Sequence, residues 1–588
     1  MIDSTSEESL GKARDWRLFA RLGRYLWPYR VSIGLSTLLL LMVSLLSLIQ
    51  PYLIKVAIDQ YIAAGSLEGF STIIVIFLLV LAAEFGLKYV QGYMIQRTGQ
   101  KVSFDLRTNL FSHLQRLPVK FFDTNPVGRL MTRLTTDVEN INEVFSSGIV
   151  VILGDIFMLV GIVIAMLYLN ISLALVTFMV IPPLFGITIY FRKYLRENHR
   201  TVTLAIARIN SYIQEAVSGA MVSKLFGQEG KNQRKFSGLA RDHLQARLRL
   251  THLYALYFPT IEIIGALALA LIIWYGGGAI IKQALTFGTL VAFIEYIHKF
   301  FSPIRDLSEK YTSMQSAAAS AERIFRLLDT PAVEALQPRK VKHIAYPGIT
   351  SQGLWFSYDG HNPVLKDINF SVHPGETVAL VGPTGAGKTT LVNLLVRFYE
   401  PQKGVITVGG VNIKELDLTE LRNYIGVVFQ DPFLFSGDIE SNIALGNRSP
   451  SAETIRAAAR MANLDHFWAD QPKGYHHPVS ERGRTLSTGQ RQLVCFARAL
   501  AYDPQILILD EATSSVDSET EALIQDAVKK LMAGRTSIVV AHRLSTVLTA
   551  DRILVLHKGQ LVEEGTHKQL WAKNGIYHKL CQLQFGLE

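Results

Sequence analysis

Hydrophobic and polar residues are distributed very unevenly along this chain. The first half contains six long apolar stretches, each near the ~20 residues that a helix needs to cross the hydrocarbon core of a membrane. In the last 240 residues the apolar runs shorten to four or five residues and alternate with helical patterns, which is typical of a soluble α/β domain. The six predicted membrane helices cover residues 31–50, 70–90, 149–169, 172–191, 254–275 and 285–301.

The segments around these stretches complete the predicted organisation. Residues 14–29 form an amphipathic segment with Trp and Arg, which we expect to lie in the membrane interface. Residues 103–117 and 205–226 carry apolar side chains at helical spacing between charges, so we expect helices that extend into the cytoplasm. The expected regions are an N-terminus at 1–30, a transmembrane domain at 31–329, a proline-containing linker at 330–348 and a soluble domain at 349–588.

Basic residues indicate how the chain crosses the membrane. The N-terminal segment and both long loops are rich in Arg and Lys, whereas the short loop at residues 57–69 contains neither. The positive-inside rule therefore places both termini, the long loops and the soluble domain in the cytoplasm of a multi-pass inner or plasma membrane protein.

The net charge of +10 is open to two interpretations, because basic chains bind nucleic acid or face anionic lipids. The charge is concentrated in loops beside the membrane, so we expect contact with membrane lipids and no nucleic-acid partner. Only two cysteines are present, which excludes a disulfide framework.

A glycine-rich loop between a predicted strand at 377–381 and a predicted helix at 390–398 carries the clearest chemistry. Small residues let backbone N–H groups surround a phosphate at the start of a helix, so this context predicts an ATP site. We expect Lys388 to bridge the β- and γ-phosphates and the Thr389 hydroxyl to hold Mg²⁺. The loop and the first helical residue are Gly382, Pro383, Thr384, Gly385, Ala386, Gly387, Lys388, Thr389 and Thr390.

Two carboxylates follow the buried strand predicted at residues 506–509. We expect Asp510 to orient Mg²⁺ and Glu511 to act as the base that polarises the attacking water. The alternative is a pair of surface acids, which the phosphate loop in the same domain disfavours.

The residues between these two motifs carry a resemblance to a known family. Leu486, Ser487, Thr488, Gly489 and Gln490, followed by a predicted helix at 491–501, resemble the LSGGQ signature of ATP-binding cassette (ABC) proteins. Other positions resemble further elements of that family: Tyr358 the aromatic that stacks on adenine, Gln430 the Q-loop residue that contacts Mg²⁺, Glu481-Arg482-Gly483 a motif before the signature, Asp517 the D-loop and His542 the switch histidine.

The resemblance covers nearly the whole chain. Six spans followed by one nucleotide-binding domain resemble a half-transporter exporter of the multidrug or lipid type, whose fold is called type I or type IV. Residues 121–123 and 128–129 fit its first intracellular loop, and residues 215–229 fit the second, which in the family contacts the partner's ATPase domain.

The resemblance also implies a dimer. In the family, ATP lies between the phosphate loop of one domain and the signature of the other, with the helix that follows Ser487 presenting N–H groups to the γ-phosphate. His542 would sense that phosphate, and Gln430 would couple Mg²⁺ to the intracellular helices.

One residue departs from the family pattern. Thr488 replaces the first glycine of the signature while Glu511 is intact, a combination found in one partner of heterodimeric exporters. This favours a second, different half-transporter chain as partner. The alternative is that threonine is tolerated and the chain forms a homodimer.

Acidic residues inside the predicted spans are the candidate substrate site: Glu84, Asp155, Glu262 and Glu295. Intramembrane carboxylates are costly and usually face a cavity or a partner. Their similar depth suggests an acidic lining that accepts amphiphilic cations. The alternative is that they pair with one another, with Lys88 or with His298.

We therefore expect an ATP-hydrolysing exporter that moves hydrophobic or amphiphilic substrates, such as drugs, lipids or peptides, out of the cytoplasm or inner leaflet by alternating access. Two alternatives are a homodimeric lipid flippase and an ATP-gated channel or regulatory subunit. The intact Lys388, Glu511 and His542 disfavour a gate, which requires no repeated hydrolysis. Six spans exclude a soluble ATPase.

Overall fold

The computed structural model describes residues 16–332, 344–445, 450–469, 471–510, 517–541 and 543–585. Its contacts divide the chain into two compact units, which we describe separately. The helical unit extends to Gln115 and continues from Val127 to Thr330, and the α/β unit comprises residues 116–126 together with the chain from Pro331 onward. Residues 116–126, which the sequence placed with the transmembrane domain, therefore pack with the α/β unit.

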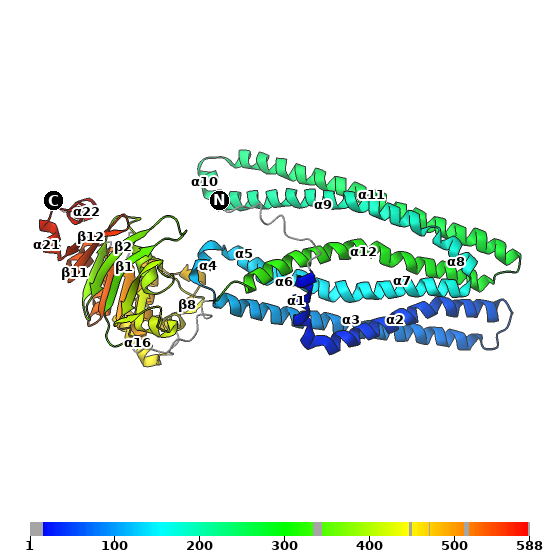
Figure 1. Ribbon diagram of the computed structural model, residues 1–588, viewed down its shortest axis with the longest axis horizontal. Helices are drawn as coiled ribbons and strands as arrows, with labels where there is room; N and C mark the ends of the chain where they lie inside the picture. Colours follow the sequence, from blue (N-terminus) through cyan, green and yellow to red (C-terminus); the bar gives the residue numbers. More distant parts are fainter. Residues whose placement is uncertain are drawn as a thin grey trace. The chain divides into compact units, whose positions relative to one another are not determined.

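Long helices form the first unit (Figure 1). α3 has 46 residues and α11 has 53, so each measures roughly 70–80 Å at 1.5 Å per residue, against a hydrocarbon core of roughly 30 Å. The predicted extension at residues 103–117 continues α3, whereas the one at residues 205–226 runs through α9 and, beyond Gly219, through α10. The helices are α1 (Trp16–Leu26), α2 (Arg30–Val56), α3 (Phe70–Gln115), α5 (Val127–Thr132), α6 (Val138–Glu143), α7 (Ile149–Leu169), α8 (Ile171–Phe178), α9 (Ile181–Ser218), α10 (Ala220–Leu225), α11 (Glu229–Ile281) and α12 (Phe287–Leu328).

Among the described residues, five helical stretches are long and apolar enough to cross a membrane, one fewer than the six predicted. The sixth prediction, residues 285–301, falls largely within α12, which is helical but contains Glu295, His298 and Lys299. α12 packs in the core of the unit, where Ala292 and Phe293 are fully buried. A helix surrounded by other helices needs less apolar surface than one that faces lipid, which explains the difference.

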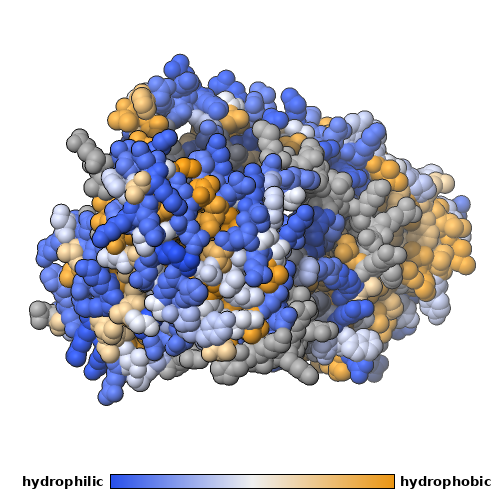
Figure 2. Space-filling view, turned by 60° about the vertical axis from the view of Figure 1, so that its left-hand side comes forward, coloured by the Kyte–Doolittle hydropathy of each residue, from blue (hydrophilic) through white to orange (hydrophobic). Residues whose placement is uncertain are grey.

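Many apolar side chains of this unit are exposed, and apolar residues gather at the distant right-hand side of Figure 2. Leu79 and Phe85 on α3 and Ile164 on α7 are each more than 60% exposed. An exposed apolar surface of this extent is expected where lipid replaces water as solvent.

A two-stranded sheet pairs β7 (Gly437–Asp438) with β8 (Pro478–Val479), and two larger sheets build most of the second unit. One has the strand order β12-β11-β3-β10-β9-β6 and is parallel except for β12, and the other is antiparallel with the order β2-β1-β4-β5. β9 and β10 are buried at every position, as their short apolar runs predict. The strands are β1 (Ile349–Phe356), β2 (Leu365–Val372), β3 (Thr377–Val381), β4 (Lys403–Val408), β5 (Val411–Asn412), β6 (Ile425–Val428), β9 (Ile506–Asp510), β10 (Thr536–Val540), β11 (Arg552–His557) and β12 (Gln560–Gly565).

Helices beside these strands begin and end close to their predicted bounds. α13 (Lys388–Leu395) ends three residues before the predicted bound, and Arg397 adopts a left-handed backbone (φ 54°) just beyond it. α18 (Thr488–Ala501) begins three residues early because Ser487 caps it.

The α/β unit contains separate hydrophobic cores. One core joins the two sheets and includes Leu391 of α13, and another surrounds α18 and includes Leu486 and Leu493. The glycine-rich loop and the signature are therefore anchored on different cores.

Candidate functional site

The glycine-rich loop connects β3 to α13 and is closed on one side and open on the other. A Cβ at Gly387 (φ 104°) would lie 2.6 Å from the Leu365 side chain, and one at Gly382 would lie 2.2 Å from the Leu556 carbonyl oxygen. A Cβ at Gly385 (φ 81°) would meet no atom within 4 Å. The backbone can thus pack tightly at its two ends and face open space at its middle, as a phosphate cradle requires.

Lys388 is folded into this loop. Its side-chain nitrogen donates hydrogen bonds to the carbonyl oxygens of Gly382 (2.7 Å) and Pro383 (3.2 Å). Burial lowers the pKa of the Lys388 ammonium group, and the charge of Asp510 opposes that change. The loop therefore holds a cation beside the open face of its backbone.

Parallel pairing brings the ends of β3 and β9 to one edge of the sheet, with β10 between them. There the Thr389 hydroxyl donates to a carboxylate oxygen of Asp510 at 3.3 Å. Within the described residues, no cluster of three or more His, Cys, Asp or Glu side chains could hold a metal. A hydroxyl and one carboxylate fit Mg²⁺, which is usually bound through one or two such groups together with phosphate oxygens.

Tyr358 follows β1 and is 41% exposed. Its hydroxyl donates to the Thr390 hydroxyl at 3.2 Å, which ties the ring to the first turn of α13. Asp359 stabilises the loop that follows Tyr358 by accepting hydrogen bonds from the backbone N–H groups of His361 and Asn362. These bonds, led by that from Asn362, hold the pKa of Asp359 well below its ordinary value. One face of Tyr358 is thus available for stacking.

The signature forms the start of α18. The Ser487 hydroxyl accepts from the Gln490 backbone N–H at 3.2 Å, and the Gln490 side chain accepts from the Ser487 N–H at 3.0 Å, a reciprocal capping box. The Thr488 hydroxyl accepts from the Arg491 guanidinium at 3.2 Å. Gly489 is buried, whereas Ser487 is exposed.

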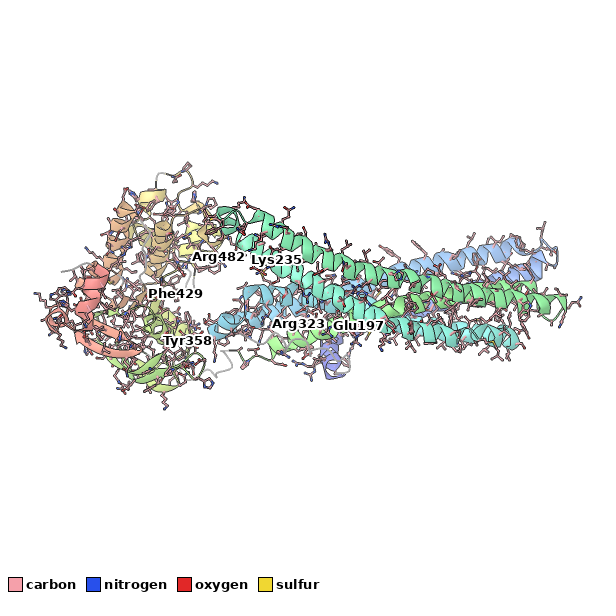
Figure 3. All side chains as sticks on the ribbon, turned by 90° about the horizontal axis from the view of Figure 1, so that it is seen from above. Glu197, Lys235, Arg323, Tyr358, Phe429 and Arg482 are labelled. Atoms are coloured by element: carbon pink, nitrogen blue, oxygen red, sulfur yellow. The ribbon has the colours of Figure 1, made fainter. Side chains whose placement is uncertain are left out.

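The two nucleotide half-sites lie apart within one chain. In Figure 3, Tyr358 and Arg482, which marks the motif before the signature, occupy separate parts of the α/β unit. Their separate hydrophobic cores agree with this placement. The residues predicted to form the two halves of a nucleotide site therefore lie apart within one chain.

The structure places only some of the other predicted site residues. Asp517 caps α19 (Ser518–Met532) by accepting from the Thr520 N–H at 2.9 Å, which lowers the pKa of Asp517. Gln430 is exposed just after β6, which ends at Val428. Glu511 and His542 lie outside the described residues.

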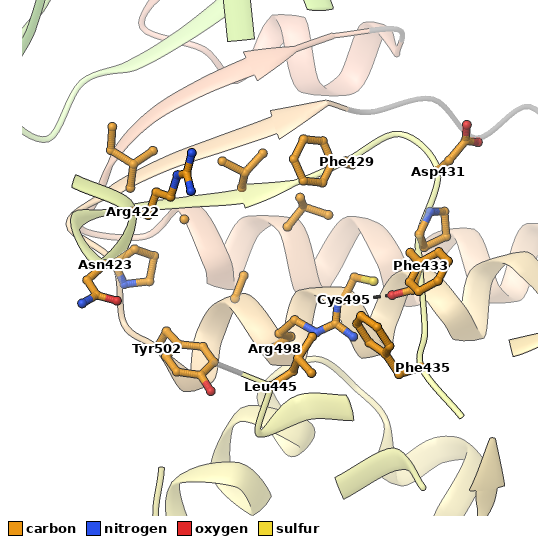
Figure 4. Close-up of a pocket in the computed structure, with 17 residues that line it drawn as sticks. Arg422, Asn423, Phe429, Asp431, Phe433, Phe435, Leu445, Cys495, Arg498 and Tyr502 are labelled. Carbon is orange, nitrogen blue, oxygen red and sulfur yellow. Dashed lines mark hydrogen bonds between the residues drawn. The ribbon is translucent and has the colours of Figure 1, made fainter. Parts of the chain in front are cut away.

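A groove of about 340 Å³ lies between the end of β6 and α18 (Figure 4). Phe433 and Phe435 line it and are 50% and 51% exposed. Arg498 crosses it, donating to the Phe433 carbonyl oxygen at 3.3 Å. Sequence motifs did not identify this groove, because its lining residues are far apart along the chain.

The intramembrane carboxylates occupy different environments. Glu84 is half-buried and accepts a hydrogen bond from the Gln50 side chain. Asp155 and Glu295 are half-buried, whereas Glu262 is exposed on α11. The structure thus connects Glu84 to α2, and Glu262 differs from the other three carboxylates in being exposed.

Lys299, which no sequence motif singles out, shares Gln50 as a hydrogen-bond partner with Glu84. Its amine donates to the Ser47 carbonyl oxygen (2.8 Å), the Ser47 hydroxyl (2.9 Å) and the Gln50 amide oxygen (2.9 Å). Pro51 lies inside α2 and has no N–H, so the Ser47 carbonyl has no helical donor four residues on. Lys299 of α12 supplies that missing donor. Proline four residues after a serine was the only sequence signal.

Comparisons with known proteins agree with this architecture. The model of the ABC transporter transmembrane region matches residues 33–304, and the ABC transporter model matches residues 365–514. A probable multidrug resistance ABC transporter ATP-binding/permease protein, YheH of Bacillus subtilis, is 37% identical over 87% of this chain and 76% of its own length. An ATP-dependent lipid A-core flippase of Syntrophus aciditrophicus is 36% identical over 97% of this chain and 94% of its own length.

A solved structure extends the comparison. A bacterial Atm1-family ABC exporter with ATP bound superposes with a TM-score of 0.79 at 28% identity, covering 94% of this chain and 98% of that one. The chain belongs to the ABC exporters, in which a transmembrane region and an ATP-binding domain are fused. It is a multi-pass membrane protein whose ATPase activity is coupled to transport.

Proposed function

We propose that this chain is one half of a dimeric exporter that moves hydrophobic or amphiphilic molecules out of the cytoplasm or the inner leaflet. ATP is bound between the phosphate loop of one chain and the signature of the other. The observation that carries the proposal is the separation of these half-sites in one chain, on different hydrophobic cores. A second chain in the opposite orientation supplies the missing half to each.

The residues have distinct roles in this site. Tyr358 stacks on the base, Lys388 and the loop N–H groups hold the phosphates, and the first turn of α18 in the second chain faces the γ-phosphate. Thr389, Asp510 and Gln430 hold Mg²⁺, which neutralises phosphate charge. We further assign Glu511 as the base for water, His542 as the γ-phosphate sensor and Asp517 as the D-loop carboxylate.

The partner is proposed to be a different half-transporter. Thr488 introduces a β-branched side chain where the family pattern has glycine, so the site built with this signature should turn over slowly. Purification of the chain alone, followed by an ATPase assay in lipid nanodiscs, tests this. Low activity that rises when a second half-transporter is co-expressed supports the heterodimer. Robust activity of the chain alone would exclude it and favour the homodimer.

We propose that α10 docks onto the α/β unit of the second chain, as the resemblance of the second intracellular loop implies. Met221 and Leu225 on α10 are 84% and 79% exposed, and the groove beside Phe433 offers an apolar surface of suitable chemistry. Cysteines at positions 221 and 433, in a variant lacking Cys495 and Cys581, should form a disulfide between chains. A cross-link that forms only within one chain would contradict this arrangement.

The proposed substrates are amphiphilic cations that contact Glu295, Glu262, Asp155 and Glu84. Glu84 is already hydrogen-bonded to Gln50, so Glu295 is the better single test. Glu295→Gln should reduce ethidium transport several-fold while basal ATPase activity stays the same. The substitution removes one negative charge, whose attraction for the cation is roughly 1 kcal/mol or more. Unchanged ethidium transport would remove the cation proposal.

Lipid transport is the second candidate, and the lipid A-core flippase among the relatives favours it. A fluorescent phosphatidylethanolamine in proteoliposomes distinguishes the two candidates, because a flippase changes its leaflet in an ATP-dependent way. We place the protein in the inner or plasma membrane with the ATPase unit in the cytoplasm, on the basis of the basic loops.

A further inference from the structure

A short helix from the first intracellular loop contacts the nucleotide-binding unit directly. α4 (Val119–Thr124) belongs to the segment 116–126 that packs with this unit. Its residue Asp123 accepts a hydrogen bond from the hydroxyl of Tyr399, although the two residues are 276 positions apart in the sequence. The bond therefore joins an intracellular loop to the interior of the ATPase fold.

Tyr399 is well suited to carry this contact. It follows α13, the helix that begins at Lys388, and is only 8% exposed, within the core that supports the phosphate loop. Burial and the bond to Asp123 raise the pKa of Tyr399. The hydroxyl therefore stays protonated and donates a hydrogen bond to the carboxylate.

Tyr399 belongs to a cluster of three aromatic rings that includes Tyr358 of the proposed base site. The Tyr358 and Tyr399 rings meet edge to face, with centroids 5.0 Å apart and an interplanar angle of 88°. Phe356 completes the cluster, 4.9 Å from Tyr358 and 5.5 Å from Tyr399. Edge-to-face packing fixes the plane of one ring relative to the next, so a base stacked on Tyr358 also restrains Tyr399.

We propose that Tyr399 is a positioning residue that transmits the occupancy of the base site at Tyr358 to α4 through its hydrogen bond to Asp123. The relay rests on the proposed nucleotide site, because it requires a base on Tyr358. It gives the chain a path from nucleotide to intracellular loop that is separate from the phosphate contacts and from Gln430. A base-free triphosphate would bind the loop without engaging this path.

Hydrogen exchange of the α4 amides in full-length protein in nanodiscs tests the relay. AMP-PNP should slow exchange at residues 119–125 roughly ten- to a hundredfold, the range that one hydrogen bond to a charged group supplies. Tyr399→Phe keeps the aromatic cluster but removes the hydroxyl, so it should abolish this slowing while the Kd for AMP-PNP changes less than about twofold. Inorganic tripolyphosphate should not slow exchange in any variant.

Tyr475→Phe is a matched control, because Tyr475 donates to Asp465 in the same unit with its pKa raised by the same causes. This variant should keep the response of α4. Asp123→Asn retains an oxygen acceptor and should keep part of it, whereas Asp123→Ala should not.

The outcomes distinguish a failure of the proposed ATP site from a failure of the relay. If the wild-type chain binds no AMP-PNP, the proposed ATP site fails. If it binds AMP-PNP but α4 does not respond, or if Tyr399→Phe responds as the wild type does, the relay is wrong and the ATP site stands. An equal response to tripolyphosphate would also overturn the relay, because the base would then play no part.

Discussion

Single side chains at the start of α18 shape the backbone of the predicted signature. Ser487 and Gln490 cap each other, which leaves the intervening backbone N–H groups at the helix start. Thr488 directs its hydroxyl to Arg491, which also donates to the Gly483 carbonyl oxygen at 3.4 Å. The Thr488 hydroxyl is thus hydrogen-bonded within its own chain. Its branched carbon remains at the position where a glycine would let a phosphate approach the backbone more closely.

Replacing Thr488 separates the two properties of its side chain. Thr488→Gly should raise the ATPase rate of the assembled dimer several-fold, as expected if the branched carbon costs about 1 kcal/mol of transition-state contact. Thr488→Val keeps the branch but removes the hydroxyl, so it should not accelerate hydrolysis. Equal rates for the glycine and valine variants would contradict the steric explanation and remove its support for the heterodimer.

Ser487→Ala tests whether this cap serves more than stability. Loss of an N-cap destabilises by about 1 kcal/mol, which a lower Tm in detergent reports. Ser451 caps α16 (Ala452–Met461) by accepting from the Thr454 N–H, so Ser451→Ala is a matched control. Both variants should lose similar stability, but only Ser487→Ala should lower ATPase activity. A comparable loss of activity in Ser451→Ala would mean that the effect is structural.

At the scale of elements, the contact between α2 and α12 shows how a membrane helix accommodates proline. Pro51 leaves the Ser47 carbonyl without its helical donor, and Lys299 binds it from α12. Tyr296 of the same helix donates to the neighbouring Leu48 carbonyl oxygen at 2.7 Å. Unsatisfied carbonyls are costly in a membrane, so these bonds join the two helices at a defined register.

Lys299→Met should therefore destabilise the protein by about 1–3 kcal/mol, because a buried carbonyl loses its donor. Lys88→Met on the exposed surface of α3 is the control and should change Tm little. Adding Pro51→Ala to Lys299→Met restores a backbone N–H for Ser47 and should recover part of the loss. Equal Tm values for Lys299→Met and Lys88→Met, or no recovery in the double variant, would contradict this role.

Sequence patterns predicted individual elements better than the contacts between them. The apolar run before Asp510 and the glycine-rich loop define β9 and the start of α13, because strand burial and phosphate loops depend on neighbouring residues. The bond from Lys299 to Ser47 spans 252 positions, and that from Tyr399 to Asp123 spans 276. No local period in the sequence predicts such pairs, so the sequence offers Lys88 and His298 as partners for the acids but does not identify Lys299.

At the scale of the whole molecule, the account depends on two chains completing one another's nucleotide sites. Because the chain belongs to the ABC exporters, it is an ATPase whose activity is coupled to transport. In the proposed function, nucleotide binding draws two α/β units together and hydrolysis lets them separate, so the helical units alternate between inward- and outward-facing states. A pump of this kind uses the free energy of hydrolysis in each cycle, whereas a gate needs binding alone.

Uptake into inside-out membrane vesicles tests this claim most directly. Vesicles that contain the chain, with its partner half-transporter if one is required, are given ethidium or fluorescent phosphatidylethanolamine together with ATP or AMP-PNP. The account predicts accumulation or leaflet transfer against the gradient with ATP, none with AMP-PNP, and none in Lys388→Ala, which lacks the phosphate-loop cation. Flux that AMP-PNP supports and that stops at equal concentrations would contradict it, because the protein would then be a nucleotide-gated pore.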